Sequence, residues 1–244
     1  MRLPFLLAGL LCASPALADT TAVYAFPNDA AIVTVEIASG GNLRITISGK
    51  VIEEARQKLP TAQQDDVGLY GLIVRDGEGY IVEPGQDGSL AVVRQGDMER
   101  AIREILEERQ NVPPSDDESG GSPFVEQGTV TIGGRIGRAF YRGTDRATPA
   151  VVVTTDPDLA ELAAAMQRQY SSRARGIGVI GLPNVSGPMR AALAQGAPIA
   201  LGGMQLRSVK HDPIPSARFA LPQPPRTLDQ VRAMVAPRKI LDLP

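Results

Sequence analysis

Cysteine, histidine and tryptophan are almost missing from this chain of 244 residues, which has one cysteine, one histidine and no tryptophan. One histidine and a single cysteine at position 12 leave a transition-metal site without its usual ligands, so we expect no metal and no cofactor. Aromatic residues make up 4% of the chain, which disfavours stacking of sugars or bases. The net charge is −2, and nucleic acid is therefore not an expected partner.

The chain also lacks an apolar run long enough to cross a bilayer. Its first such run, Leu3 to Leu11, has about nine residues, whereas a transmembrane helix needs ~20. This run follows Met1-Arg2 and precedes Ala16-Leu17-Ala18, an arrangement typical of a secretory signal peptide with an A-x-A cleavage site. We expect cleavage between Ala18 and Asp19, which would remove residues 1–18. Cleavage there would also remove Cys12. A lipid anchor on Cys12 is disfavoured, because a lipoprotein signal needs a small residue directly before the cysteine and the residue here is large. The expected product is a periplasmic monomer that is free of disulfides.

Short alternating apolar segments dominate residues 19–110. The clearest strand is 43–48, where Leu43, Ile45 and Ile47 alternate with polar residues. Residues 40–42 and 76–79 are turn formers between apolar segments and predict hairpins. Further strand patterns occur at 23–26, 32–37, 69–75, 80–82 and 90–93, so we expect an antiparallel meander of about six strands. A helical period follows, with Asp97 expected as its N-terminal cap.

Residues 111–123 are poor in apolar side chains and rich in proline, glycine and charge, which predicts a flexible linker. The segment 124–244 then has strand patterns at 129–132, 135–141, 150–154, 198–201 and 204–210, with an extended stretch at 219–221. Helices are expected after Asp156-Pro157, near 189–194 and near 228–234. We expect this half to complete the sheet of the first half, although two subdomains remain an alternative. The predicted fold class is α+β, mainly antiparallel: a curved, half-barrel-like meander covered by two or three helices.

No constellation in the sequence assigns a catalytic residue. His211 is followed by Asp212, but neighbours on a strand point to opposite faces, so a surface polar pair is expected. Ser186 lacks the first glycine of a nucleophile elbow. Residues 133–137 resemble a phosphate loop only superficially, because strand-forming residues follow them, and a hairpin is predicted instead. The acidic run 116–118 lacks the ligand spacing of a calcium loop.

The alternating apolar faces have two interpretations that the pattern cannot separate. A curved sheet covered by helices can enclose a ligand cavity, or its apolar side chains can fill an ordinary core. Core packing is the simpler account. The sequence therefore assigns no numbered residue to ligand binding.

Two segments carry a resemblance to known proteins: Leu69 to Tyr80 within the meander, and the ending from Leu206 to Pro222. With the exported start, they resemble uncharacterised proteobacterial envelope proteins, which are similar to the lipoprotein-carrier (LolA/LolB-like) half-barrel families. The resemblance implies a curved antiparallel sheet with helices over its concave side. In relatives this fold holds acyl chains or senses envelope lipoproteins.

Three hypotheses about function follow. The leading one is a non-enzymatic periplasmic protein that binds an apolar ligand, or an envelope lipoprotein or lipid, in its curved sheet. The second is an interaction or sensor module that uses the proline-rich tail and the acidic insert as contact segments. The third is an unrecognised hydrolase, for which exchange of His211 for alanine would abolish activity.

Overall fold

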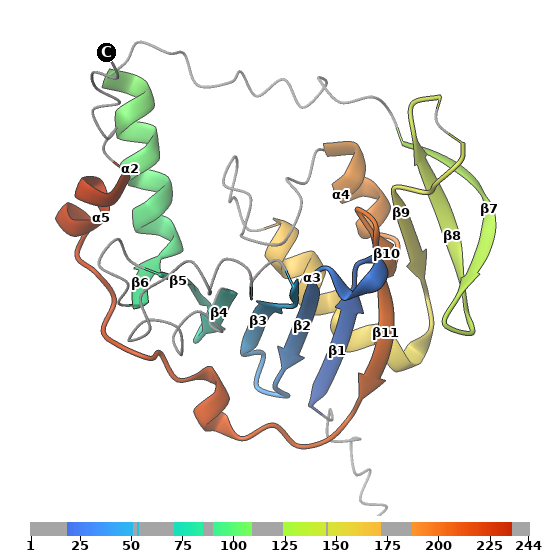
Figure 1. The fold of residues 1–244 in the computed structure, drawn as a ribbon, viewed down its shortest axis with the longest axis horizontal. Coiled ribbons are helices and arrows are strands. Elements are labelled where there is room, and N and C mark those ends of the chain that lie inside the picture. Colours follow the sequence, from blue (N-terminus) through green and yellow to red (C-terminus); the bar gives the residue numbers. More distant parts are fainter. Residues whose placement is uncertain are drawn as a thin grey trace, which may run out of the picture.

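The computed structural model describes residues 19–50, 53, 71–84, 90–108, 124–144, 146–171 and 187–235. The predicted signal peptide and the predicted linker lie outside these ranges. Eleven antiparallel strands form one open, curved sheet, and four α-helices are among the described elements (Figure 1). The predicted fold class, a mainly antiparallel α+β meander covered by helices, is confirmed.

The first half of the chain contributes six strands and one helix. They are β1 (Thr20–Ala25), β2 (Ile32–Ile37), β3 (Leu43–Ser48), β4 (Gly71–Arg75), β5 (Glu78–Pro84), β6 (Leu90–Arg94) and α2 (Gln95–Glu108). A 3-10 turn, η1 (Pro27–Asp29), lies between the first two strands.

The second half contributes five strands and three α-helices. They are β7 (Phe124–Ile132), β8 (Arg135–Arg142), β9 (Val151–Thr154), α3 (Ala160–Ser171), α4 (Gly187–Leu193), β10 (Ala197–Leu201), β11 (Met204–Lys210) and α5 (Leu228–Val235). Two further 3-10 turns are η4 (Pro157–Leu159), before α3, and η5 (Ser216–Phe219), between β11 and α5.

The strand order is β6-β5-β4-β3-β2-β1-β11-β10-β9-β8-β7. Within β1 to β6 and within β7 to β11 each strand therefore pairs with its neighbours in sequence, and the two halves join where β1 pairs with β11. Thr21 lies opposite Lys210 at one end of this junction and Ala25 lies opposite Gln205 at the other. Strands β6 and β7 form the two edges, so the sheet follows the path of an up-and-down barrel that is open between them.

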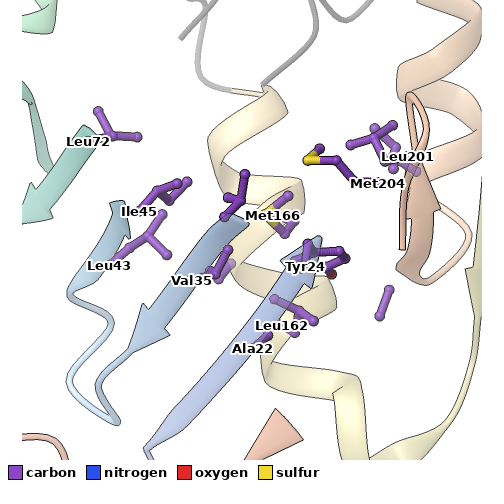
Figure 2. Packing of buried hydrophobic residues seen from close by; sticks show 14 of the residues in the cluster. Ala22, Tyr24, Val35, Leu43, Ile45, Leu72, Leu162, Met166, Leu201 and Met204 are labelled. Atoms are coloured by element: carbon purple, nitrogen blue, oxygen red, sulfur yellow. The ribbon is translucent and has the colours of Figure 1, made fainter. Parts of the chain in front are cut away.

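One face of the sheet, here called the inner face, packs against α3. Its side chains come from alternate positions of the strands, because successive residues of a strand point to opposite faces. In Figure 2, Leu162 and Met166 of α3 lie next to Ala22, Tyr24 and Val35 of β1 and β2. All five are at most 3% exposed. The helix therefore fills the space over the centre of the inner face with ordinary core packing.

The other face, the outer face, is covered at β3 to β6 by the segment 211–227, here called the strap. The strap runs from the end of β11 to α5, as the red-orange stretch of Figure 1 shows. Its Leu221 packs against an apolar cluster on the outer face that consists of Ile73, Val82, Leu90 and Val92. Its backbone also bonds the sheet edge, where the N–H of Arg226 donates to the carbonyl oxygen of Val92 at 2.8 Å.

The far end of the strap is fastened through α5, which packs on α2. Arg232 of α5 donates two hydrogen bonds to the carboxylate of Glu104 on α2, at 2.7 and 2.9 Å. These bonds raise the pKa of Arg232 and lower the pKa of Glu104. The strap is thus held at both ends and along its length.

The strand predictions agree with the structure for β2 and β3 to the residue, and the helix predicted near 228–234 is α5. The hairpin at 76–79 is confirmed with a tighter turn: β5 already starts at Glu78, and the two turn residues, Asp76 and Gly77, have φ of 53° and 80°. The segment 133–137, which resembles a phosphate loop only superficially, also forms the predicted hairpin. Gly133 and Gly134 link β7 to β8 there, with φ of 57° and 79°.

Three boundary predictions are wrong. Asp97 does not cap its helix, because α2 already begins at Gln95, directly after β6; Asp97 lies in the first turn, where the helix dipole favours a carboxylate. Strand β7 begins at Phe124 and not at 129, because its first residues pair with β8 although most are exposed and show no apolar alternation. The stretch 219–221 is not uniformly extended, since Phe219 closes the turn η5.

Candidate functional site

A pocket of about 180 Å³ lies between the outer face of the sheet and the strap. Its floor comes from β3, β4 and β5, and includes Thr46, Ile73 and Val82. Its opposite wall comes from the strap, and includes Ala217, Arg218, Ala220 and Pro222. Arg44 of β3 lines it as well. The pocket is thus lined mainly by apolar residues, together with two arginines.

The two arginines share one carboxylate. Glu36 and Arg44 are cross-strand partners on β2 and β3, and Nη1 of Arg44 lies 3.0 Å from Oε2 of Glu36. Arg218 of the strap donates to the same carboxylate from Nε and Nη2, each at 3.0 Å. Glu36 is 6% exposed and Arg44 is 8% exposed, whereas the side chain of Arg218 is 48% exposed. This ion triad pins the strap to the sheet beside the pocket.

The charge balance of the triad is uneven, with two cations and one anion. Burial lowers the pKa of Arg44, the nearby charge of Arg218 lowers it further, and Glu36 acts in the opposite direction. A guanidinium stays charged in proteins, so a lowered pKa here signals unfavourable electrostatics and not deprotonation. The pocket therefore lies next to an excess positive charge.

Local geometry explains why the triad forms at this place. The turn at 38–42 closes with the N–H of Ala38 donating to the carbonyl oxygen of Asn42, and Gly41 adopts a φ of 85°. This turn sets the register that places Glu36 opposite Arg44. Next to it, a Cβ at Gly71 would lie 1.9 Å from the carbonyl oxygen of Ile45, so only glycine lets β4 approach β3 at the pocket floor.

A second polar cluster lies at the ends of β1, β8, β9 and β11. Nε2 of His211 lies 2.7 Å from Oδ1 of Asp158, and its Nδ1 lies 3.3 Å from the hydroxyl of Thr20. Arg135 bonds the other oxygen of Asp158 at 2.6 Å. The hydrogen bond from Arg135, and then that from His211, lower the pKa of Asp158. The hydroxyl of Thr20 donates to Glu161 of α3 at 3.1 Å.

This cluster resembles a hydroxyl–imidazole–carboxylate chain in its connections only. Thr20 is 1% exposed, and its hydroxyl proton points to Glu161 and not to His211. A nucleophile needs access to substrate and a base that takes its proton. The arrangement instead ties β1, β11 and the start of α3 together.

The structure places the other residues singled out by the sequence as follows. Asp19 accepts from the N–H of Ser39 at 2.8 Å and from the N–H of Ile214 in the strap at 2.6 Å, and these bonds lower its pKa. His211 and Asp212 are both exposed, as predicted for a surface polar pair, and Nε2 of His211 contacts Asp158. Cys12, Ala16, Ala18, Ser186 and the acidic run 116–118 lie outside the described residues.

Sequence reasoning missed the triad. A signal for part of it was present, because Glu36 and Arg44 have opposite charges and lie on either side of the predicted turn at 40–42. Arg218 had no such signal, since it is 182 residues from Glu36. Only the path of the strap brings it there.

No protein-family model, no curated protein and no solved structure matches this chain. Among the described helices, none combines the length and apolar character that spanning a membrane requires. Within the same ranges, no group of three or more histidine, cysteine, aspartate or glutamate side chains is placed to hold a metal ion.

Proposed function

We propose that this chain is an exported, non-enzymatic binding protein of the bacterial envelope, and that it takes a small, largely apolar molecule into the strap pocket. The pocket is the observation that carries the proposal. Small-molecule sites are typically concave and mostly apolar, with a few polar groups that fix orientation, and this pocket has that composition. At about 180 Å³ it lies below the usual range of roughly 300–1,000 Å³, so the ligand is small.

The position of the pocket refines the hypothesis of a ligand held in the curved sheet. The centre of the inner face packs against α3 and the preceding turn η4, and Leu159 of η4 and Leu162 of α3 are fully buried. The pocket lies on the outer face, where the strap leaves a gap above β3 to β5. The sheet still supplies the floor of the pocket, and the strap, which is part of the proline-rich tail, covers it.

A binding role fits the second polar cluster better than hydrolysis does. The hydroxyl of Thr20 is buried and already donates to Glu161, while His211 and Asp158 are joined at the surface. Both pairs link strand ends to α3 and its preceding turn. The cluster therefore supports a structural role for His211, and exchange of His211 for alanine would lower stability rather than abolish a reaction.

Export rests on residues 1–18 and is tested separately. Protein recovered from the periplasmic fraction of its own host should begin at Asp19 when its N-terminus is sequenced. In that product the Asp19 side chain would still hold Ser39 and Ile214 as in the structure. Recovery only from the cytosol, with the leader intact, would contradict export.

Ligand binding is tested by native mass spectrometry of the periplasmic protein and by titration with 1-hexanol. Ala220→Leu places a larger side chain in the pocket wall and should abolish hexanol binding. Ala191→Leu, at an exposed position of α4 away from the pocket, is the matched control and should bind as the parent does. An extracted chain that is always empty, together with hexanol binding that Ala220→Leu leaves unchanged, would refute the proposal. An empty chain that retains a protein partner would favour the interaction module.

A further inference from the structure

We propose that the ligand of the strap pocket is a monoanion, specifically a short apolar carboxylate, whose head group is bound jointly by Arg44 of the sheet and Arg218 of the strap; this rests on the proposed function. The observation behind it is that both arginines line the pocket and that their guanidinium groups meet at the carboxylate of Glu36.

Arg44 has more hydrogen-bond donors than its one carboxylate partner uses. A guanidinium carries five N–H donors, and among the described residues Arg44 donates only one hydrogen bond, from Nη1 to Glu36. The residue is 8% exposed, but none of its nitrogens is both fully buried and without a partner, so its unused N–H groups are accessible to a ligand. A buried charged donor gains from a partner, and the carboxylate geometry matches the arginine fork. A ligand carboxylate in the pocket would supply that partner.

The charge of the triad selects a monoanion. Two arginines and one glutamate leave one uncompensated positive charge beside the pocket. A carboxylate brings the site to neutrality, and it offsets the repulsion between Arg44 and Arg218 that lowers the pKa of Arg44. A phosphate near its dianionic form would leave an excess negative charge close to Glu36, which is almost fully buried.

The size and lining of the pocket determine the length and the polarity of the rest of the ligand. A volume of about 180 Å³ is well below the roughly 300–1,000 Å³ typical of small-molecule sites, so the apolar part of the ligand is short. Ile73, Val82 and Pro222 provide apolar contacts beyond the arginines. A short aliphatic acid such as hexanoate, with eight non-hydrogen atoms, is the probe of this size class.

Because Arg44 belongs to β3 and Arg218 belongs to the strap, a bound carboxylate would bridge the two. The strap is already tied to the sheet by Glu36, and the ligand would add a second ionic link at the same place. Binding should therefore slow proteolysis of the strap and raise the thermal midpoint, because a ligand specific to the native state stabilises it.

The test is calorimetric titration of the purified full chain with hexanoate, 1-hexanol and hexyl phosphate at pH 7. Hexanoate should bind at least about tenfold more tightly than hexanol, the equivalent of one charge-assisted hydrogen bond. Arg44→Gln should remove this preference and leave hexanol binding unchanged. Arg218→Gln, at a half-exposed side chain, should weaken hexanoate binding in the same direction. Arg207→Gln, at an exposed position of β11, is the matched control and should have no effect.

The outcomes separate this inference from the proposed function. Equal binding of hexanoate and hexanol, in the parent and in both pocket variants, would overturn the carboxylate and leave an apolar binding site. Tighter binding of hexyl phosphate than of hexanoate would overturn the monoanion. Failure of all three ligands to bind would overturn both. Circular dichroism of each variant shows whether a lost signal reflects the pocket or the fold, and Arg218→Gln decides the question if Arg44→Gln unfolds.

Discussion

Replacing Glu36 by glutamine removes the only anion of the ion triad while keeping the shape of the side chain. The variant leaves Arg44, at 8% exposure, without a carboxylate partner. Breaking a buried ion pair in this way costs about 3–5 kcal/mol, because the remaining charge stays buried and uncompensated. The side chain of Arg218 is 48% exposed, so loss of its bonds adds at most about 1 kcal/mol.

This cost is large relative to the 5–15 kcal/mol by which domains are usually stable. Urea unfolding followed by far-UV circular dichroism should show a clearly lower midpoint for Glu36→Gln with an unchanged slope, since the area exposed on unfolding stays the same. The double variant Glu36→Gln, Arg44→Gln should be more stable than the single one, because two neutral amides can pair across β2 and β3 without a buried charge.

The matched control is Glu78→Gln. Glu78 pairs with Arg94 at 3.3 Å, but both side chains are about half exposed, so the expected change is under about 1 kcal/mol. If Glu36→Gln proves no more harmful than Glu78→Gln, or if the double variant loses as much as the two single changes together, the buried pair does not hold the strap as argued.

Three further predictions concern the strap and the strand ends. Phe219→Ala removes a side chain of the strap that is 2% exposed and should cost about 3–5 kcal/mol in urea unfolding; a loss below about 1 kcal/mol would mean that the strap is not packed as described. Tyr24→Phe deletes a buried hydroxyl that donates to a carbonyl of β10 at 2.7 Å, and it should cost about 1–3 kcal/mol by leaving that carbonyl unpaired; calorimetric unfolding measures it. The pKa of Asp158 is lowered by Arg135 and His211, so this carboxylate contributes stability that is present above its unfolded pKa of about 4 and is lost as the pH falls through its folded pKa. Asp158→Asn should therefore be less stable at pH 7 and lose less stability on acidification, and parallel pH profiles of the two proteins would contradict this.

Much of the fold could be predicted because local patterns decide it. In β2 and β3 each alternate residue is apolar, and glycines in the intervening turn fix the register, so local signals and tertiary structure agree. The start of β7 could not be predicted, because the residues directly after Phe124 are exposed and show no apolar alternation, although they pair with β8. Hydrophobic period carries no information about such a strand.

The candidate site could be predicted only in part, because its members come from distant segments. The pairing of Glu36 with Arg44 could be predicted from the hairpin, because oppositely charged side chains at facing positions of two antiparallel strands tend to pair. The partner of His211 is Asp158, 53 residues away, which no local rule could select. The same holds for Arg218, whose position depends on where a stretch with little regular secondary structure crosses the sheet.

The position of the strap nevertheless left a trace in the hydrophobic pattern of the strands that it covers. Strand β3 alternates between apolar and polar residues, which is typical of a strand with one buried face. Strand β6 reads Leu90 to Val93 without a polar residue, and all four side chains are buried. A continuous apolar run indicates burial on both faces, so the sequence of β6 requires a cover on the outer face in addition to the core on the inner one. The strap supplies that cover, and its removal beyond residue 212 should expose Val92 and its neighbours and cause aggregation of an otherwise complete sheet.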